Sequence, residues 1–96
     1  MKPVYRPAAA ADIEHAYAWY EKEQRGLGEA FLAEVDATAK LVLENPLAYP
    51  VIVRQTRRAL VHRFPYGLLY RVLSDKVLFI ACFHTSQSPA LWKRRH

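Results

Sequence analysis

The sequence predicts one α+β domain over residues 1–96, with an N-terminal strand and a helical hairpin packed on an antiparallel sheet of four to five strands. Three observations indicate this class. The composition, 52% hydrophobic and 24% charged, is that of an ordinary folded protein. Apolar residues recur every three to four positions in the first half of the chain, which favours helices. After Pro50 they follow a period of two, which favours strands.

The N-terminal segment predicts a short strand followed by a helix. Val4 and Tyr5 lie between Pro3 and Pro7, and proline is tolerated at the ends of strands but not inside a sheet. Pro7 also suits the first turn of a helix. The apolar spacing that follows predicts an amphipathic helix over about residues 8–24.

A second helix is expected after the break at Gly26-Leu27-Gly28. Its apolar positions run from Leu27 to Val42, and it ends at Asn45-Pro46 because a residue before proline is driven out of the helical region. The short turn predicts an antiparallel αα-hairpin. Four acidic residues on the outer helix faces are interpreted as solubilising: Glu14, Glu21, Glu29 and Asp36.

Four strands are predicted in the second half, over residues 51–53, 59–64, 68–73 and 76–84. Their short connections permit only antiparallel neighbours. One face of the sheet is expected to pack on the helices, and the other to be partly covered or to form a groove. A hairpin that turns about Tyr66-Gly67, within the segment Phe64-Pro65-Tyr66-Gly67, would place His62 opposite Arg71 and Arg63 opposite Tyr70, and a change of register by one residue would alter these pairs.

Several classes of protein are disfavoured by the sequence. No apolar run approaches the ~18 residues of a membrane span, and the N-terminus lacks the apolar region of a signal peptide. The one cysteine, Cys82, cannot form an internal disulfide and lies in an apolar run, which predicts a buried structural thiol. We therefore expect a cytoplasmic protein without membrane contact.

Metal and cofactor motifs are also missing from the sequence. The four histidines have no ligand-like spacing and no cysteine cluster beside them. Three glycines form neither a P-loop nor a dinucleotide fingerprint, and no serine lies in a nucleophile elbow. We expect no metal and no cofactor.

Charge is distributed unevenly along the chain. Residues 1–48 hold five Lys and Arg against eight Asp and Glu, a net charge of −3, whereas residues 49–96 hold nine against one, a net charge of +8. Clustered cations steer association with anions. The second half is therefore expected to meet an acidic or polyanionic partner.

Two overlapping sets of residues are candidates for function. Arginines beside His and Trp could contact a partner or a nucleic acid; this set is Arg54, Arg57, Arg58, His62, Arg63, Trp92, Lys93, Arg94 and Arg95. Metal-free RNA cleavage would need a base, cations for the charged phosphorane and an acid; this set is Arg58, Arg63, Arg71 and His84.

The order of several segments resembles the RelE/ParE toxin superfamily over nearly the whole chain. These segments are WYEKEQRGLGEAFL (19–32), NPLAYP (45–50), RRALVHRFPYGLLYRV (57–72) and VLFIACFHTSQSPALWKRR (77–95). The resemblance implies a toxin of a type II toxin–antitoxin system, of the kind also called plasmid stabilisation proteins. It further implies a cognate antitoxin that neutralises the toxin, in a homodimer or in a heterotetramer with the antitoxin.

Two mechanisms diverge within this superfamily. RelE-like members cut messenger RNA on the ribosome with sheet cations and a C-terminal arginine and tyrosine, and ParE-like members bind DNA gyrase. Arg58, Arg63 and Arg71 match the sheet cations, but residues 85–88 contain no arginine and Trp92 replaces the tyrosine. We therefore expect a ParE-like toxin that acts by binding. The alternatives are a RelE-like, ribosome-dependent endoribonuclease and a non-toxic basic interaction domain of the same fold.

Overall fold

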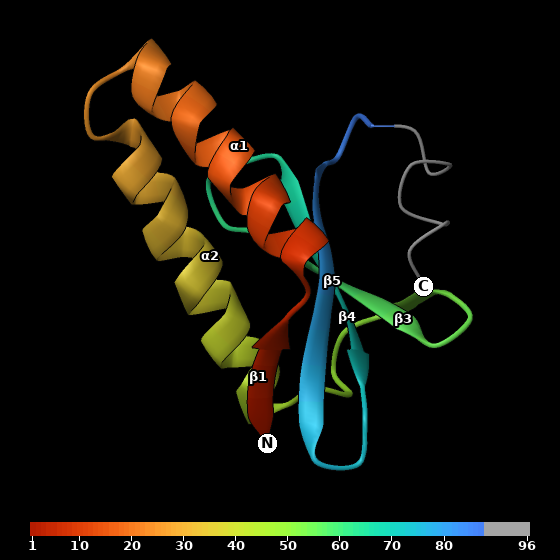
Figure 1. Ribbon diagram of the computed structural model, residues 1–96. Helices are drawn as coiled ribbons and strands as arrows, with labels where there is room; N and C mark the ends of the chain where they lie inside the picture. Colours follow the sequence, from red (N-terminus) through yellow and green to blue (C-terminus); the bar gives the residue numbers. More distant parts are fainter. Residues whose placement is uncertain (88–96) are drawn as a thin grey trace.

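Two helices cover one face of a five-stranded sheet in the computed structural model, which describes residues 1–87 (Figure 1). The predicted α+β class, helical hairpin and order of elements are confirmed. In the described part of the chain, no helix is both long and apolar enough to cross a membrane. The elements are β1 (Lys2–Tyr5), α1 (Pro7–Glu23), α2 (Leu27–Glu44), β2 (Val51–Val53), β3 (Thr56–Leu60), β4 (Tyr66–Val72) and β5 (Lys76–His84).

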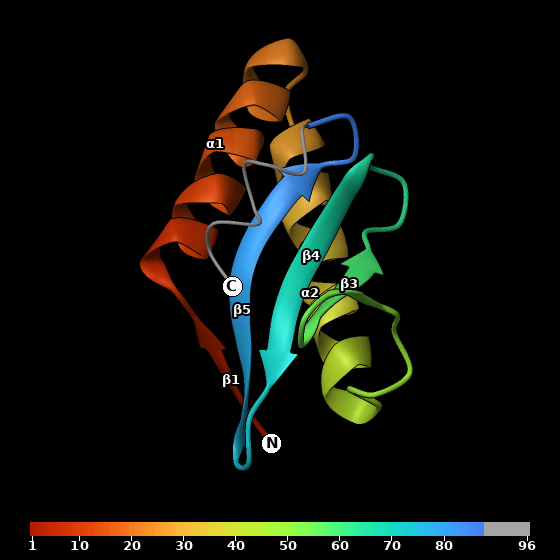
Figure 2. The ribbon, with the colours of Figure 1, turned by 90° about the vertical axis from the view of Figure 1, so that its right-hand side faces the viewer.

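The sheet has the strand order β1-β5-β4-β3-β2 and is mixed (Figure 2). Strands β2 to β5 pair antiparallel, as predicted. Strand β1 runs parallel to β5, with Lys2 opposite Lys76 and Tyr5 opposite Phe79, so the prediction of an entirely antiparallel sheet was wrong for β1. Short connections fix the direction only of successive strands. Because both helices and three strands lie between β1 and β5 in the sequence, β1 can pair with β5 in either direction.

The register of the β3–β4 hairpin differs from the predicted one. Arg57 lies opposite Tyr70 and Leu60 opposite Gly67. The predicted pairs, His62 with Arg71 and Arg63 with Tyr70, were therefore wrong. So was the predicted strand over 59–64, because β3 begins at Thr56 and ends at Leu60.

A wide connection at residues 61–65 causes this shift. Val61 and Phe64 turn inward and are buried, and Arg63 adopts a positive φ of 73°. Pro65 has no N–H to donate to a strand ladder. The connection is closed by a hydrogen bond from the Val61 N–H to the Tyr66 carbonyl, at 2.8 Å. Hydrophobic burial thus overrides the tight turn that the local sequence indicates.

An aromatic cluster joins the helices to this connection. Phe31 of α2 is fully buried, and its ring centroid lies 5.3 Å from Phe64 and 5.1 Å from Tyr66. Tyr20 of α1 lies 4.9 Å from Phe64 and 5.4 Å from Phe31. Edge-to-face pairs at these distances add to the stabilisation from burial. The cluster therefore fixes residues 61–65 against both helices.

The face of the sheet remote from the helices holds a second, smaller cluster. Leu69, Ile80, Ala81 and Phe83 are buried there. Strands β4 and β5 are consequently buried on both faces, which agrees with the prediction that the second face is covered or forms a groove. Cys82 points into the main core as a free thiol, and burial raises its pKa to about 12, so its assignment as a buried structural thiol is confirmed.

A carboxylate fastens the turn of the helical hairpin. The backbone N–H groups of Gly26 and Gly28 donate to the two carboxylate oxygens of Glu21, each at 2.9 Å. Gly28 must lack a side chain, because a Cβ there would lie 2.7 Å from the Tyr17 carbonyl oxygen. The interpretation of Glu21 as only solubilising was therefore wrong, since it caps the exposed amides at the start of α2.

This cap predicts a pH-dependent contribution to stability. Hydrogen bonds from the backbone amides of Gly26 and Gly28 lower the pKa of Glu21 below the ordinary value of a glutamate. A lowered pKa in the folded state adds stability at pH 7 that is lost as the pH falls through that pKa. Glu21→Gln should therefore have a lower free energy of unfolding than the parent chain at neutral pH. This difference in free energy should disappear in acid. Urea unfolding across this range measures it.

Glu14→Gln is the matched control, because Glu14 is an exposed carboxylate on the same helix. Its stability relative to the parent chain should change little with pH. A gap for Glu21→Gln that stays constant from neutral to acidic pH would contradict the capping role.

Candidate functional site

Cations gather on the face of the sheet that the helices leave uncovered. Side chains alternate between faces along a strand. Ala59 belongs to the core beneath the helices, so its neighbour Arg58 points to the remote face, where it borders Leu69 and Phe83. Arg71 of β4 lies on the same face, two residues after Leu69. Two of the predicted site residues are thus presented from neighbouring strands.

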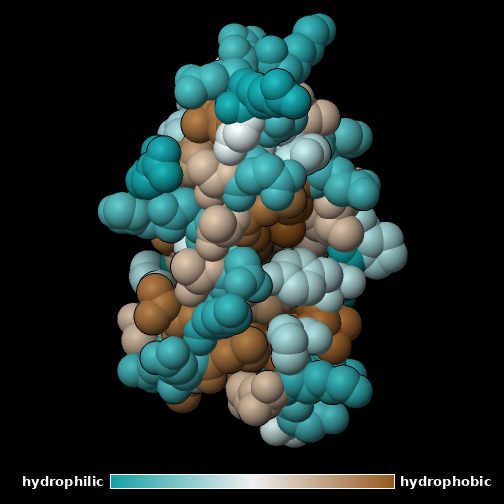
Figure 3. Space-filling model, turned by 90° about the vertical axis from the view of Figure 1, so that its left-hand side faces the viewer, coloured by the Kyte–Doolittle hydropathy of each residue, from teal (hydrophilic) through white to brown (hydrophobic). Residues whose placement is uncertain are grey.

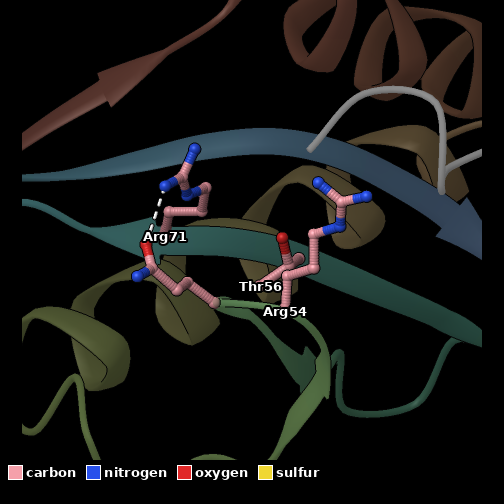
Figure 4. Close-up of a pocket in the computed structure, with 4 residues that line it drawn as sticks. Arg54, Thr56 and Arg71 are labelled. Carbon is pink, nitrogen blue, oxygen red and sulfur yellow. Dashed lines mark hydrogen bonds between the residues drawn. The ribbon is translucent and has the colours of Figure 1, made fainter.

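Arg54 and Arg71 line a pocket of about 320 Å³ together with Gln55 and Thr56 (Figure 4). Arg54 lies in the turn between β2 and β3 with a φ of 51°, which is uncommon for a residue with a side chain. One N–H of the Arg71 guanidinium donates to Gln55 Oε1 at 2.8 Å. Since no acidic residue lines this pocket in the described part of the chain, its potential is positive.

Arg58 and His84 meet at a second, smaller hollow of about 70 Å³. The stem of Arg58 lies over Gly67, where a Cβ would be 2.9 Å from Arg58 Cδ. His84 ends β5, and its Nδ1 accepts the Ser86 N–H at 3.0 Å. A neutral imidazole has one accepting nitrogen, so this bond assigns the ring proton to Nε2. The free edge of His84 is therefore a hydrogen-bond donor.

Arg57 is engaged inside the molecule, on the helix side of the sheet. Its Nη1 donates to the carbonyl oxygens of Tyr49 at 2.6 Å and Leu47 at 3.2 Å. Its cross-strand neighbour Tyr70 donates its hydroxyl to the Pro46 carbonyl at 2.6 Å, and burial raises the Tyr70 pKa to about 12. These two side chains hold the α2–β2 connection against the sheet.

His62 and Arg63 lie on the connection beside α2. His62 is exposed, and its Nδ1 lies 3.6 Å from a carboxylate oxygen of Glu34. The Arg63 guanidinium lies 5.5 Å from the centroid of the Phe64 ring, a cation–π geometry. The remaining predicted binding residues lie outside the described residues: Trp92, Lys93, Arg94 and Arg95.

An apolar hollow of about 390 Å³ lies at the same end of the molecule, between α1 and the β3–β4 connection. It is lined by Trp19, Tyr20, Pro65, Tyr66 and His84. Trp19 is 58% exposed, which is unusual for so large an apolar side chain. From the helix side, hydrophobic patches reach the surface between hydrophilic ones (Figure 3). This end of the protein therefore combines the apolar side chains of the hollow with the neighbouring cations Arg58 and Arg63.

Sequence reasoning missed Gln55, Thr56 and the aromatic hollow. A usable signal for Thr56 was its position midway between Arg54 and Arg58, because a period of two would place all three on one face. The hollow combines residues far apart in the sequence, and no local pattern marks it. Within residues 1–87, no three His, Cys, Asp or Glu side chains gather as a metal site.

Comparison with known families decides the relationship. The profile of a family described as the ParE toxin of the type II toxin–antitoxin system parDE matches residues 4–89. The chain belongs to the ParE toxin family. The resemblance to the RelE/ParE superfamily is thereby confirmed, and membership in the ParE family implies a cognate antitoxin as partner.

A solved structure agrees with the ParE fold. The chain superimposes with a TM-score of 0.66 on a chain of a structure titled as the chromosomal ParDE toxin–antitoxin system from P. aeruginosa, at 20% identity. The match covers 88% of this chain and 95% of that chain. Among curated proteins, none matches this ParE-family chain.

Proposed function

We propose that this ParE-family toxin stops bacterial growth in the cytoplasm by binding DNA gyrase, and that a cognate antitoxin prevents this. One fold serves two activities in the superfamily, binding to gyrase and cleavage of messenger RNA, and we assign this chain to the first. Its cationic end of the sheet and the aromatic hollow beside it would then recognise the target.

The hydrogen bonding of His84 is the observation that carries this proposal. Cleavage through the ribose 2′-hydroxyl needs a general base, and such a group contributes about 10²–10⁴ in rate. The accepting nitrogen of His84 is occupied by the Ser86 N–H. The next residues close a turn, in which the backbone N–H of His84 donates to Gln87 Oε1 at 2.7 Å and the backbone N–H of Thr85 donates to the Pro65 carbonyl oxygen. Within residues 84–87, this arrangement supplies no free imidazole base and no additional cation, which supports a toxin that acts by binding.

The aromatic hollow supports a protein target. Protein interfaces are anchored by aromatic and arginine side chains at their centre. Trp19 and Tyr66 line the hollow together with His84, which also borders Arg58. An apolar anchor with a cation beside it suits the surface of a protein better than a phosphate backbone, whose contacts are mainly polar and charged.

A supercoiling assay with purified gyrase tests the proposal. The purified chain should block supercoiling of relaxed plasmid, and prior addition of the antitoxin should restore it. Primer extension on messenger RNA after induction provides the second measurement and should show no new ends. Discrete cuts within codons, together with unimpaired gyrase, would replace this proposal by the RelE-like ribonuclease.

Induced expression without antitoxin tests toxicity itself. Growth should stop soon after induction, and co-expression of the antitoxin should restore it. Normal growth at a good soluble yield would instead indicate the non-toxic basic interaction domain.

Arg63→Ala is expected to weaken gyrase inhibition more than Lys22→Ala. Arg63 is exposed beside the aromatic hollow, whereas Lys22 is an exposed cation in the last turn of α1. Loss of one interface charge worth about 1 kcal/mol should raise the concentration for half-inhibition about 3–10-fold. The comparison is made by titrating both variants in the supercoiling assay. Equal effects would place the gyrase-binding surface away from the sheet end.

A further inference from the structure

The arginine pocket, formed by Arg54, Gln55, Thr56 and Arg71, contains a polar atom that the fold does not use. Thr56 is completely buried, and its Oγ1 has no hydrogen-bond partner in the described part of the chain. A buried hydroxyl without a partner lowers stability, and valine has the same shape without that cost. The hydroxyl points to the same side as the two guanidinium groups (Figure 4). Its orientation suggests a ligand.

The charges of the arginine pocket are also uncompensated. Arg54 makes no hydrogen bond or ion pair with the rest of residues 1–87, and Arg71 uses one N–H on the neutral Gln55 amide. Two guanidinium groups that face one pocket without an acid repel each other, and a bound anion would remove that repulsion. The pocket thus combines two fork-shaped donors with a hydroxyl donor.

We propose that the arginine pocket binds a carboxylate side chain of an acidic polypeptide. One carboxylate oxygen accepts from the Thr56 hydroxyl, and the other accepts from the guanidinium groups in the paired geometry that arginine forms with carboxylates. The identification of this polypeptide with the antitoxin rests on the proposed function. The pocket itself does not depend on gyrase.

The position of the pocket in the sheet favours a polypeptide. It lies at the turn that leaves β2, and β2 is the last strand of the sheet. An extended segment can add to such an edge through its backbone and carry a side chain to the turn. No aromatic side chain lines the pocket among the described residues, so stacking of a nucleobase is not provided for.

Binding requires Arg54 to move. The Thr56 hydroxyl has no exposed surface, whereas Arg54 is exposed and adopts a positive φ at the turn. A ligand oxygen therefore reaches the hydroxyl when the Arg54 side chain lifts, after which its guanidinium closes over the anion. Arg71 stays in place, because Gln55 holds it.

The test uses hexaglutamate as the probe and the intact chain, titrated at low salt and followed by NMR. Backbone amide signals of residues 54–56 and 71 should shift. Thr56→Val should raise the melting temperature and yet weaken hexaglutamate binding about 10–100-fold, the loss of one hydrogen bond to a charged group. Thr56→Ser should bind like the parent chain. A threonine with a merely structural role would not give these opposite effects.

Charge variants supply the matched comparison. The double variant Arg54→Gln, Arg71→Gln should weaken binding more than tenfold, whereas Lys22→Gln with Lys76→Gln, which removes the same charge elsewhere, should weaken it much less. Equal weakening by both pairs, or unchanged binding by Thr56→Val, would overturn the proposal. Stronger dependence of inorganic phosphate or oligothymidylate binding on Thr56 would make this a phosphate site and overturn the carboxylate assignment.

These measurements are independent of the proposed function. A chain that binds hexaglutamate through Thr56 but leaves gyrase active would refute the gyrase target and keep the carboxylate site. A chain that blocks gyrase but binds hexaglutamate equally well with and without the Thr56 hydroxyl would support the gyrase target and refute the carboxylate site.

Discussion

Phe31→Ala is expected to lower the free energy of unfolding by about 3–5 kcal/mol, the cost typical of removing a buried phenylalanine ring. Phe31 has no exposed surface and touches three other rings, those of Tyr20, Phe64 and Tyr66. Both helices and the connection 61–65 meet at this ring, so the cavity cannot be closed by moving one element alone. Urea unfolding measures the loss.

Leu41→Ala is the control, because Leu41 lies on the same helix but is 53% exposed. Its expected cost is below about 1 kcal/mol. Phe31→Ala should also increase hydrogen exchange at residues 61–65, since the ring holds Phe64 in place. Similar stabilities for the two variants would contradict the central position of Phe31.

Arg57→Ala is expected to cost about 1.5–3 kcal/mol, the range for hydrogen bonds to charged groups. The guanidinium holds the carbonyl oxygens of Leu47 and Tyr49, and the neighbouring Tyr70 holds that of Pro46. Without Arg57, the connection that leads from α2 into β2 loses two of these three attachments. Hydrogen exchange should rise in residues 46–50, and urea unfolding should report the lost stability.

Arg58→Ala is the matched comparison, since Arg58 is the adjacent arginine on the opposite face of β3. It should cost less than about 1 kcal/mol, because its guanidinium holds no backbone carbonyl within residues 1–87. Arg57→Lys should recover only part of the stability, since a lysine ammonium lacks the planar fork. A loss for Arg58→Ala equal to that for Arg57→Ala would contradict the clamp.

Much of the fold could be predicted, because helices and strands leave periodic patterns in the sequence. The helical hairpin follows from apolar spacing and the Gly26–Gly28 break, and β5 follows from a run of apolar residues that ends at His84. The register of the β3–β4 hairpin could not be predicted in this way. The inward turn of Val61 and Phe64 depends on an aromatic cluster built from three separate segments.

The candidate site was less accessible from the sequence. Charge alone cannot distinguish Arg57 from Arg58, although one supports a loop and the other faces the remote side of the sheet. The partners of Arg57 are backbone carbonyls, which every residue has, so the sequence gives no sign of them. The parallel pairing of β1 is hidden for a similar reason, because strands so far apart in the sequence share no local pattern.

The strand order has a consequence for the synthesis of the protein on the ribosome. Among residues 1–87, β5 is the last strand to be made, and it lies between β1 and β4 as a central strand. While residues 76–84 are still inside the ribosome, β1 has no partner and β4 lacks one neighbour. The surface that joins the β3–β4 connection to His84 therefore forms only after residue 84 has emerged. A nascent chain that ends before β5 therefore lacks this surface.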